Sequence, residues 1–247
     1  MKKGLLVALA AGLYLAALLV LLPAGMVDFA LQRATDGRLR LADAQGTVWK
    51  GSGTIEVRDT ANRSALSKGI EWHVRPESLW RARLVCEVVL ARDGSRFVVS
   101  ALPSSVEIYD AVLTLPMAVL TLAEPRLKPL RLSGDLKVQS DKLAIAQNSL
   151  RGLVKLQWRD AGSELSPVSP IGGYELRLDG QGDAVQALLT TLQGPLQLDG
   201  SGSWRKGGNL NLQATMRVPE PYREQLAPLL RLFSFQRDEG TFELQLK

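Results

Sequence analysis

Apolar and polar side chains alternate one by one along most of the chain from residue 37 onward. This period of two places the apolar side chains on one face of a β-strand and the polar ones on the other. It is typical of antiparallel strands with one face toward water. The apolar positions are Trp49, Gly51, Gly53, Ile55 and Val57; Ile70, Trp72 and Val74; Leu84, Cys86, Val88 and Leu90; Leu130, Leu132, Gly134, Leu136 and Val138; Val154, Leu156 and Trp158; Tyr174, Leu176 and Leu178; Leu196, Leu198, Gly200, Gly202 and Trp204; Leu210, Leu212, Ala214, Met216 and Val218; Phe242, Leu244 and Leu246.

The length of these runs sets the fold class. Several extend over about nine residues, whereas strands of soluble proteins usually have about 5–6. Long strands with one apolar face predict a mainly β protein, built as a curved and twisted antiparallel sheet or as a sandwich. Glycines on the apolar face indicate where the sheet bends or packs closely.

Helices are predicted to be few and short. Residues 219–233 carry apolar side chains at helical spacing, with Pro228 expected to kink or divide the helix. Residues 184–192 fit either a helix or a strand. Residues 160–173, which contain two prolines and three glycines, predict a loop, and a boundary if the body has two halves.

The N-terminal part follows a different pattern. Residues 4–27 contain no charged side chain, and as a helix they could extend about 36 Å, against roughly 30 Å of membrane hydrocarbon. Lys2 and Lys3 precede them, so the positive-inside rule leaves residues 1–3 in the cytoplasm. We therefore expect a transmembrane helix at 4–27 and a periplasmic β-rich domain at 28–247.

A cleaved signal peptide is the alternative for this segment. The apolar core of a signal peptide usually has 7–15 residues and is followed by a small-x-small cleavage site. Here the apolar run is longer, and cleavage after Ala24 would place Leu22 at the −3 position. The length of the run favours the uncleaved anchor.

Composition narrows the class of partner. The chain is 46% hydrophobic and 22% charged, which suits a folded protein with a sizeable core. Its formal net charge is +5, and acidic and basic residues are interleaved rather than gathered in a basic stripe. We therefore expect no nucleic-acid partner. The basic balance is compatible with a body close to anionic lipid headgroups.

Candidate catalytic chemistry is sparse. The chain has one histidine, His73, on the predicted polar face, and one cysteine, Cys86, on the apolar face, so no internal disulfide can form. Zinc sites usually require three or four ligands, and one histidine with one cysteine does not supply the usual sets. No nucleophile elbow or phosphate-binding glycine loop is present. We predict no catalytic, cofactor-binding or metal site, no cofactor and no small-molecule substrate.

The tryptophans permit two interpretations. Four of the five, Trp49, Trp72, Trp158 and Trp204, lie on predicted apolar strand faces, and Trp80 does not. Packing in the core is the simpler interpretation. The other is that they line a lipid-binding groove or contact a partner.

Three motifs follow one another after the N-terminal apolar segment. Residues 41–53 contain Gly-x-Val-Trp-x-Gly-x-Gly, residues 70–80 contain Trp-x-x-x-Pro-x-x-Leu, and residues 194–204 read Gly-Pro-Leu-Gln-Leu-Asp-Gly-Ser-Gly-Ser-Trp. In this order and spacing they resemble protein N of the bacterial type II secretion system, the general secretion pathway. The resemblance extends over nearly the whole chain.

The resemblance implies an inner-membrane protein of Gram-negative bacteria with a single span and a periplasmic body. It would be an accessory, non-enzymatic part of the apparatus that exports folded periplasmic proteins across the outer membrane. It would act by contact with other secretion components, through exposed strand edges. The family looks related to the AsmA-like group of long curved sheets. The alternative function is an envelope lipid-binding or lipid-transfer protein with an apolar β-groove, and an envelope enzyme ranks third.

Overall fold

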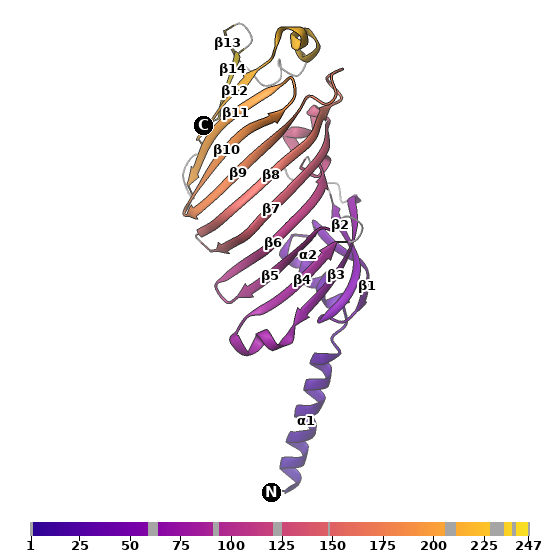
Figure 1. Ribbon diagram of the computed structural model, residues 1–247. Coiled ribbons are helices and arrows are strands. Elements are labelled where there is room, and N and C mark those ends of the chain that lie inside the picture. The colour runs from indigo at the N-terminus through magenta and orange to yellow at the C-terminus, as the bar shows by residue number, and fades with distance from the viewer. Residues whose placement is uncertain are drawn as a thin grey trace. The chain divides into compact units, whose positions relative to one another are not determined.

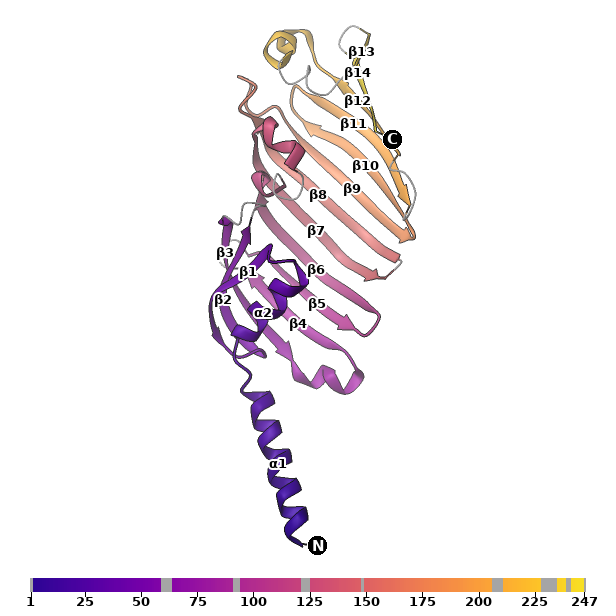
Figure 2. The ribbon, with the colours of Figure 1, turned by 180° about the vertical axis from the view of Figure 1, so that it is seen from behind.

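A computed structural model describes residues 2–58, 64–90, 94–120, 125–147, 149–205, 211–227, 235–238 and 241–246. The chain forms two compact units, unit 1 at Met1–Asp93 and unit 2 at Gly94–Lys247 (Figures 1 and 2). Within each unit, the described neighbouring strands are antiparallel. The predicted class, a mainly β antiparallel protein with a few short helices, is confirmed.

Unit 1 begins with two helices, α1 at Lys2–Val20 and α2 at Gly25–Ala34. The expectation of one continuous helix over 4–27 is therefore wrong in its extent. Pro23 lies between the two helices, where its ring supplies no backbone N–H, and it forms an isolated bridge with Thr47. Among the helices that the structure describes, none combines the length and the apolarity needed to cross a membrane.

The strands of unit 1 follow one another in sequence order. They are β1 at Leu39–Gly46, β2 at Lys50–Arg58, β3 at Ser64–Arg75 and β4 at Leu84–Leu90, with the 3-10 helix η1 at Pro76–Arg81 between β3 and β4. Ala24, Leu41, Trp72 and Val74 form its buried core. Helix α2 contributes Val27 and Leu31 to this core, so the apolar sequence after α1 packs on the sheet.

Unit 2 contains longer strands, also largely in sequence order. They are β5 at Arg96–Leu102, β6 at Ser105–Pro116, β7 at Leu132–Ala146, β8 at Ser149–Ser163, β9 at Gly172–Gly182, β10 at Ala184–Gln193, β11 at Gln197–Arg205, β12 at Asn211–Arg217, β13 at Phe235–Asp238 and β14 at Thr241–Leu246. The 3-10 helices are η2 at Met117–Val119, η3 at Pro125–Leu130 and η4 at Glu220–Tyr222. Strand β14 pairs with both β12 and β13.

The strand register of unit 2 aligns apolar residues across neighbouring strands. Leu136 of β7 lies opposite Trp158 of β8, which lies opposite Tyr174 of β9. Leu156 and Leu176 form the next such pair. The period-two pattern of the sequence therefore becomes one apolar face of the sheet.

Strands β7 and β8 each have 15 residues, and two register shifts interrupt their pairing, the second between Gln139 and Leu143. Gly152 lies there with a φ of +128°, and a Cβ at this position would collide with the carbonyl of Lys142. Only glycine fits this conformation and this close approach. Such irregularities increase the local twist of paired strands.

The structure describes three segments that the sequence pattern assigned only in outline. Residues 184–192 belong to strand β10, because β9 and β11 pair with it on both sides. The predicted loop at 160–173 is shorter: β8 continues to Ser163 and β9 begins at Gly172. The helix predicted over 219–233 is present at residues 223–227, after η4. Its remainder lies outside the described residues.

Strands β5 and β6 lie outside the alternating stretches named from the sequence. Asp110 has a φ of +49° and interrupts the pairing of β6 with both β5 and β7. An extra residue in a strand moves the apolar positions to the other face, so the period of two is lost in the sequence.

Candidate interaction surfaces

The residue types that carry catalysis are separated into different environments. His73 is exposed on β3, opposite Lys50 of β2, so its predicted place on a polar face is confirmed. Cys86 packs against the unit 1 core, and burial is the main cause that raises the pKa of its thiol. Within the described part of the chain, no group of three His, Cys, Asp or Glu side chains could hold a metal ion.

The first two sequence motifs pack against each other in unit 1, at Gln45–Gly51 and Trp72–Val74, and we call this contact the motif site. Trp72 is buried, and its indole N–H donates a hydrogen bond to the Val48 carbonyl at 3.1 Å. A Cβ on Gly51 would collide with the Trp72 ring and with the carbonyl of Gln45. The Val74 N–H donates to the Trp49 carbonyl at 2.6 Å. The glycine of the first motif therefore makes room for the tryptophan of the second.

The turn between β1 and β2 also holds the segment between α1 and α2. The indole N–H of Trp49 donates to the Leu19 carbonyl at 2.9 Å, near the end of α1. The Val48 N–H donates to the Leu22 carbonyl at 2.9 Å, and the Ala24 N–H to the Gly46 carbonyl at 3.1 Å. The turn thus fixes the place at which α1 leaves the body of unit 1.

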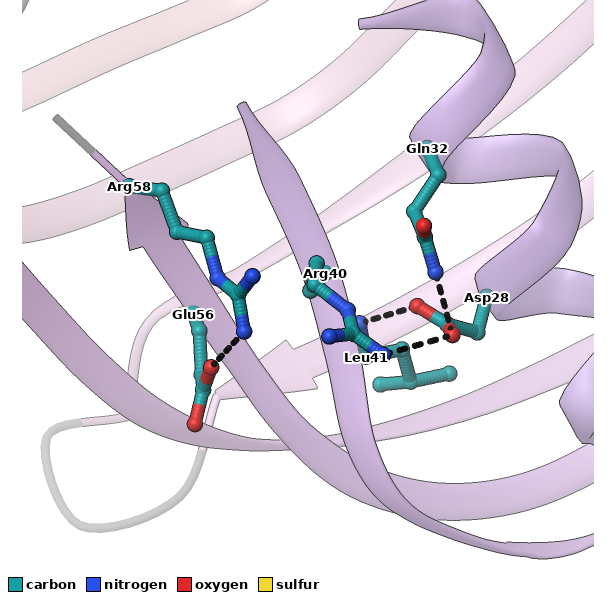
Figure 3. Close-up of polar contacts among 6 residues, drawn as sticks. All are labelled: Asp28, Gln32, Arg40, Leu41, Glu56 and Arg58. Carbon is teal, nitrogen blue, oxygen red and sulfur yellow. Dashed lines mark hydrogen bonds and ion pairs between the residues drawn. The ribbon is translucent and has the colours of Figure 1, made fainter. Parts of the chain in front are cut away.

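Helix α2 occupies part of the edge of β1, the first strand of unit 1 (Figure 3). The Leu41 N–H donates to Asp28 Oδ1 at 2.8 Å, and the Leu39 N–H donates to Thr35 Oγ1 at 3.1 Å. Open N–H groups on an edge strand can pair with a strand from another chain. At these two positions α2 and its C-cap residue Thr35 already supply the acceptors.

The carboxylate of Asp28 is held in place from both sides (Figure 3). Gln32 Nε2 donates to its Oδ2 at 2.6 Å, and Arg40 Nη2 lies 3.8 Å from the same oxygen. On the neighbouring strand β2, Glu56 and Arg58 form a separate ion pair at 3.4 Å. The contacts to Gln32 and Arg40 orient Asp28 toward the β1 backbone.

One end of the apolar face of unit 2 is covered. Trp158 and Tyr174 pack with their ring centroids 5.6 Å apart. The Tyr174 hydroxyl donates to the Leu196 carbonyl at 2.9 Å, and burial raises its pKa well above the usual value. Leu226, which is fully buried, follows η4 and belongs to the same cluster. The sequence prediction that Trp158 packs in a core is confirmed.

A shallow depression of about 570 Å³ lies on strands β8 to β12, and we call it the unit 2 depression. Two exposed leucines, Leu153 and Leu188, line it together with Arg177 and Asp179. Apolar side chains surrounded by polar ones are typical of surfaces that contact other proteins.

A buried carboxylate positions one of the polar groups of the unit 2 depression. Glu175 accepts hydrogen bonds from Gln157 Nε2 at 2.8 Å and from Arg177 Nε at 2.5 Å. The bond from Gln157, and then that from Arg177, lowers the pKa of Glu175 below its usual value. The guanidinium of Arg177 is therefore tethered where it lines the depression.

Sequence reasoning missed two of these features. Asp28 follows the apolar segment as a single acid, and no spacing pattern links it to β1. Trp204 lies on a predicted apolar face yet remains 41% exposed, and Trp80, which the pattern placed on no strand face, is 93% exposed. The alternation identifies a face but does not show what covers it.

Comparison with known proteins identifies a family. The model of the family described as type II secretion system (T2SS), protein N, matches residues 37–245. No curated protein and no solved structure matches the chain. The match includes the motif site of unit 1 and the unit 2 depression, so it covers both units.

Proposed function

The chain belongs to the protein N family of the type II secretion system, and on this premise we propose that it is an accessory component of that apparatus. It acts without catalysis, by contact with other secretion components, in the export of folded periplasmic proteins across the outer membrane. The observation that carries this proposal is the family match over residues 37–245. The motif site of unit 1, in which the first two family-like motifs pack against each other, supports the same proposal.

We further propose that α1, the described helix of the predicted span 4–27 that does not pack on the sheet, holds the protein in the inner membrane, with the N-terminus in the cytoplasm and the body in the periplasm. Support comes from the uncharged sequence after Lys2 and Lys3 and from the apolar side chains that α1 exposes, such as Val7 and Leu13. Protease added to spheroplasts should degrade the body, whereas intact cells should protect it. A body protected in spheroplasts, or a mature chain beginning near Gly25, would contradict this placement.

The unit 2 depression is the proposed contact surface for another secretion component. A photo-crosslinking amino acid at Leu188, which is 46% exposed, tests this in cells that produce the apparatus. The matched control is Val106, which is 38% exposed and does not line the depression. We expect adducts with a secretion component from position 188 and none from position 106. Equal adducts at both positions, or none at 188, would argue against this surface.

The lipid-handling alternative has one observation in its favour. On the apolar face of unit 2, side chains such as Val154, Leu156 and Leu178 are only half-buried. Mass spectrometry of the purified protein under non-denaturing conditions would detect acyl lipids bound to this face. Stoichiometric lipid that is lost in Leu178→Lys would support the alternative, and a lipid-free protein would remove it.

A further inference from the structure

The connection between β3 and β4 exposes a group of large apolar side chains. It contains η1, in which Trp80 is 93% exposed and Leu79 is 42% exposed. Leu84, the first residue of β4, is 39% exposed. Trp80 has the most exposed side chain among the large apolar residues described. We call Pro76–Leu84 the η1 loop.

Hydrogen bonds within the η1 loop fix its conformation. Ser78 Oγ donates to the Arg75 carbonyl at 2.6 Å and accepts from the Val85 N–H at 3.1 Å, which ties the two strands together. The Ala82 N–H donates to the Leu79 carbonyl at 2.9 Å. Ala82 has a φ of +50°, which ends η1 and returns the chain to β4. The exposure of Trp80 is therefore imposed by an ordered loop.

The η1 loop lies at the end of unit 1 from which α1 leaves. The start of β2 lies beside the end of β3, because Lys50 pairs with His73 and the Val74 N–H donates to the Trp49 carbonyl. Trp49 in turn donates to the carbonyl of Leu19 in α1. The loop begins at Pro76, immediately after the end of β3. Both ribbon views place η1 and the last turn of α1 at the same end of the unit 1 strands (Figures 1 and 2).

The charges around the η1 loop favour an anionic surface. Arg81 is exposed and Arg83 is half-buried, whereas the loop contains one acid, Glu77. Arg75 is already paired with Glu87. The loop thus combines a tryptophan, two leucines and a positive net charge.

From this placement we propose that the η1 loop is a second membrane contact of the protein, in which Leu79 and Trp80 enter the headgroup region of a bilayer containing anionic lipids. Tryptophan is favoured at that depth because its ring is apolar and its N–H is polar. Basic side chains near an anionic bilayer are attracted to it. The inference rests on the proposed membrane placement of α1, beside which the loop would lie.

Fluorescence quenching of the full-length protein in vesicles tests the proposal. The vesicles contain phosphatidylglycerol and lipids brominated near the headgroup end of the acyl chains, which quench only tryptophans at that depth. Trp80→Phe is compared with Trp204→Phe, the matched control from unit 2. We expect Trp80→Phe to lose a strongly quenched component of the emission, and Trp204→Phe to lose an unquenched one. Replacing phosphatidylglycerol by a zwitterionic lipid, or introducing Arg81→Glu, should reduce the quenching of Trp80.

The outcomes separate the two proposals. If the protein floats with the vesicles but Trp80 is not quenched, the η1 loop is not a membrane contact, and the anchor stands. If the protein does not float with the vesicles in a density gradient, whether they contain phosphatidylglycerol or the zwitterionic lipid, both the anchor and the loop contact are overturned. An unquenched Trp80 together with a crosslink from position 80 to a secretion component would assign the loop to a protein partner and would also overturn the inference.

Discussion

Gly51 and Trp72 show how a weak motif in the sequence becomes a constraint in the fold. A strand glycine and a strand tryptophan are each common, and neither has a special meaning alone. Here the indole of Trp72 fills the space that a side chain at Gly51 would need, and it is also bound to the Val48 carbonyl. The spacing of the two motifs therefore follows from a single contact between β2 and β3.

Substitution at this glycine gives the first prediction. Gly51→Ala forces the Trp72 ring to move within a packed core, and overpacking of this kind costs about 1–3 kcal/mol of unfolding free energy. Gly25→Ala is the control, because a Cβ there meets no atom within 4 Å. Urea unfolding of both variants measures the difference. Equal stability of Gly51→Ala and the wild type would show that the Trp72 site is not tightly packed.

The Glu175 carboxylate makes stability depend on pH. Hydrogen bonds from Gln157 and Arg177 lower its pKa in the folded protein. A depressed carboxyl pKa stabilises the fold above the unfolded value of about 4.3, and this contribution is lost as the pH falls through the folded value. We expect Glu175→Gln to cost about 1 kcal/mol at pH 7 and the difference from the wild type to vanish in acid.

Thermal unfolding between pH 3 and pH 7 measures this dependence. Glu164→Gln is the control, because Glu164 and its partner Arg131 are both 66% exposed, and such surface pairs contribute little. A difference between Glu175→Gln and the wild type that persists unchanged at pH 3 would contradict the role assigned to the charge.

At the scale of elements, the edge of β1 is closed by the helix that precedes it in the sequence. Asp28 on α2 and Thr35, the residue that caps its C-terminal end, accept the N–H groups of Leu41 and Leu39. The pairing joins the N-terminal segment to the sheet by hydrogen bonds as well as by apolar packing. A strand from a partner protein therefore cannot pair with β1 at Leu39 and Leu41 unless these hydrogen bonds break.

Removing the acceptor should open this edge. We expect Asp28→Ala to leave the Leu41 N–H without its partner, at a cost of about 1–3 kcal/mol, and to increase hydrogen exchange in β1. Hydrogen–deuterium exchange of a peptide covering residues 39–46 measures the effect. Arg33→Ala, at an exposed position in the last turn of α2, is the control and should leave exchange unchanged. Unchanged exchange in Asp28→Ala would mean that α2 does not protect the strand.

The strands also show how much of the fold the sequence could predict. Strands such as β2, β3, β7 and β8 follow from alternation, because one face of each is apolar. Strand β10 could not be distinguished from a helix, since its pairing with β9 and β11 decides its structure. Strand β6 was hidden by the irregularity at Asp110. The acceptor role of Asp28 depends on a contact between residues 28 and 41, which no local pattern specifies.

For the whole molecule, the family match assigns the chain to a component family of the type II secretion system, and the two units carry different candidate contact surfaces. Unit 1 carries the N-terminal helices, the motif site and the η1 loop. Unit 2 carries long strands and a depression with two exposed leucines. The expected likeness to AsmA-like sheets stays a prediction, because no solved structure matches the chain.

Secretion by living cells tests the central claim most directly. In a strain with an active type II secretion system, deletion of the gene for this chain should make a folded exported enzyme accumulate in the periplasm. Wild-type protein produced from a plasmid should restore export. The measurement is the ratio of extracellular to periplasmic enzyme activity. We predict that this ratio falls on deletion and recovers on complementation. An unchanged ratio, with the remaining components assembled normally, would contradict a role in secretion.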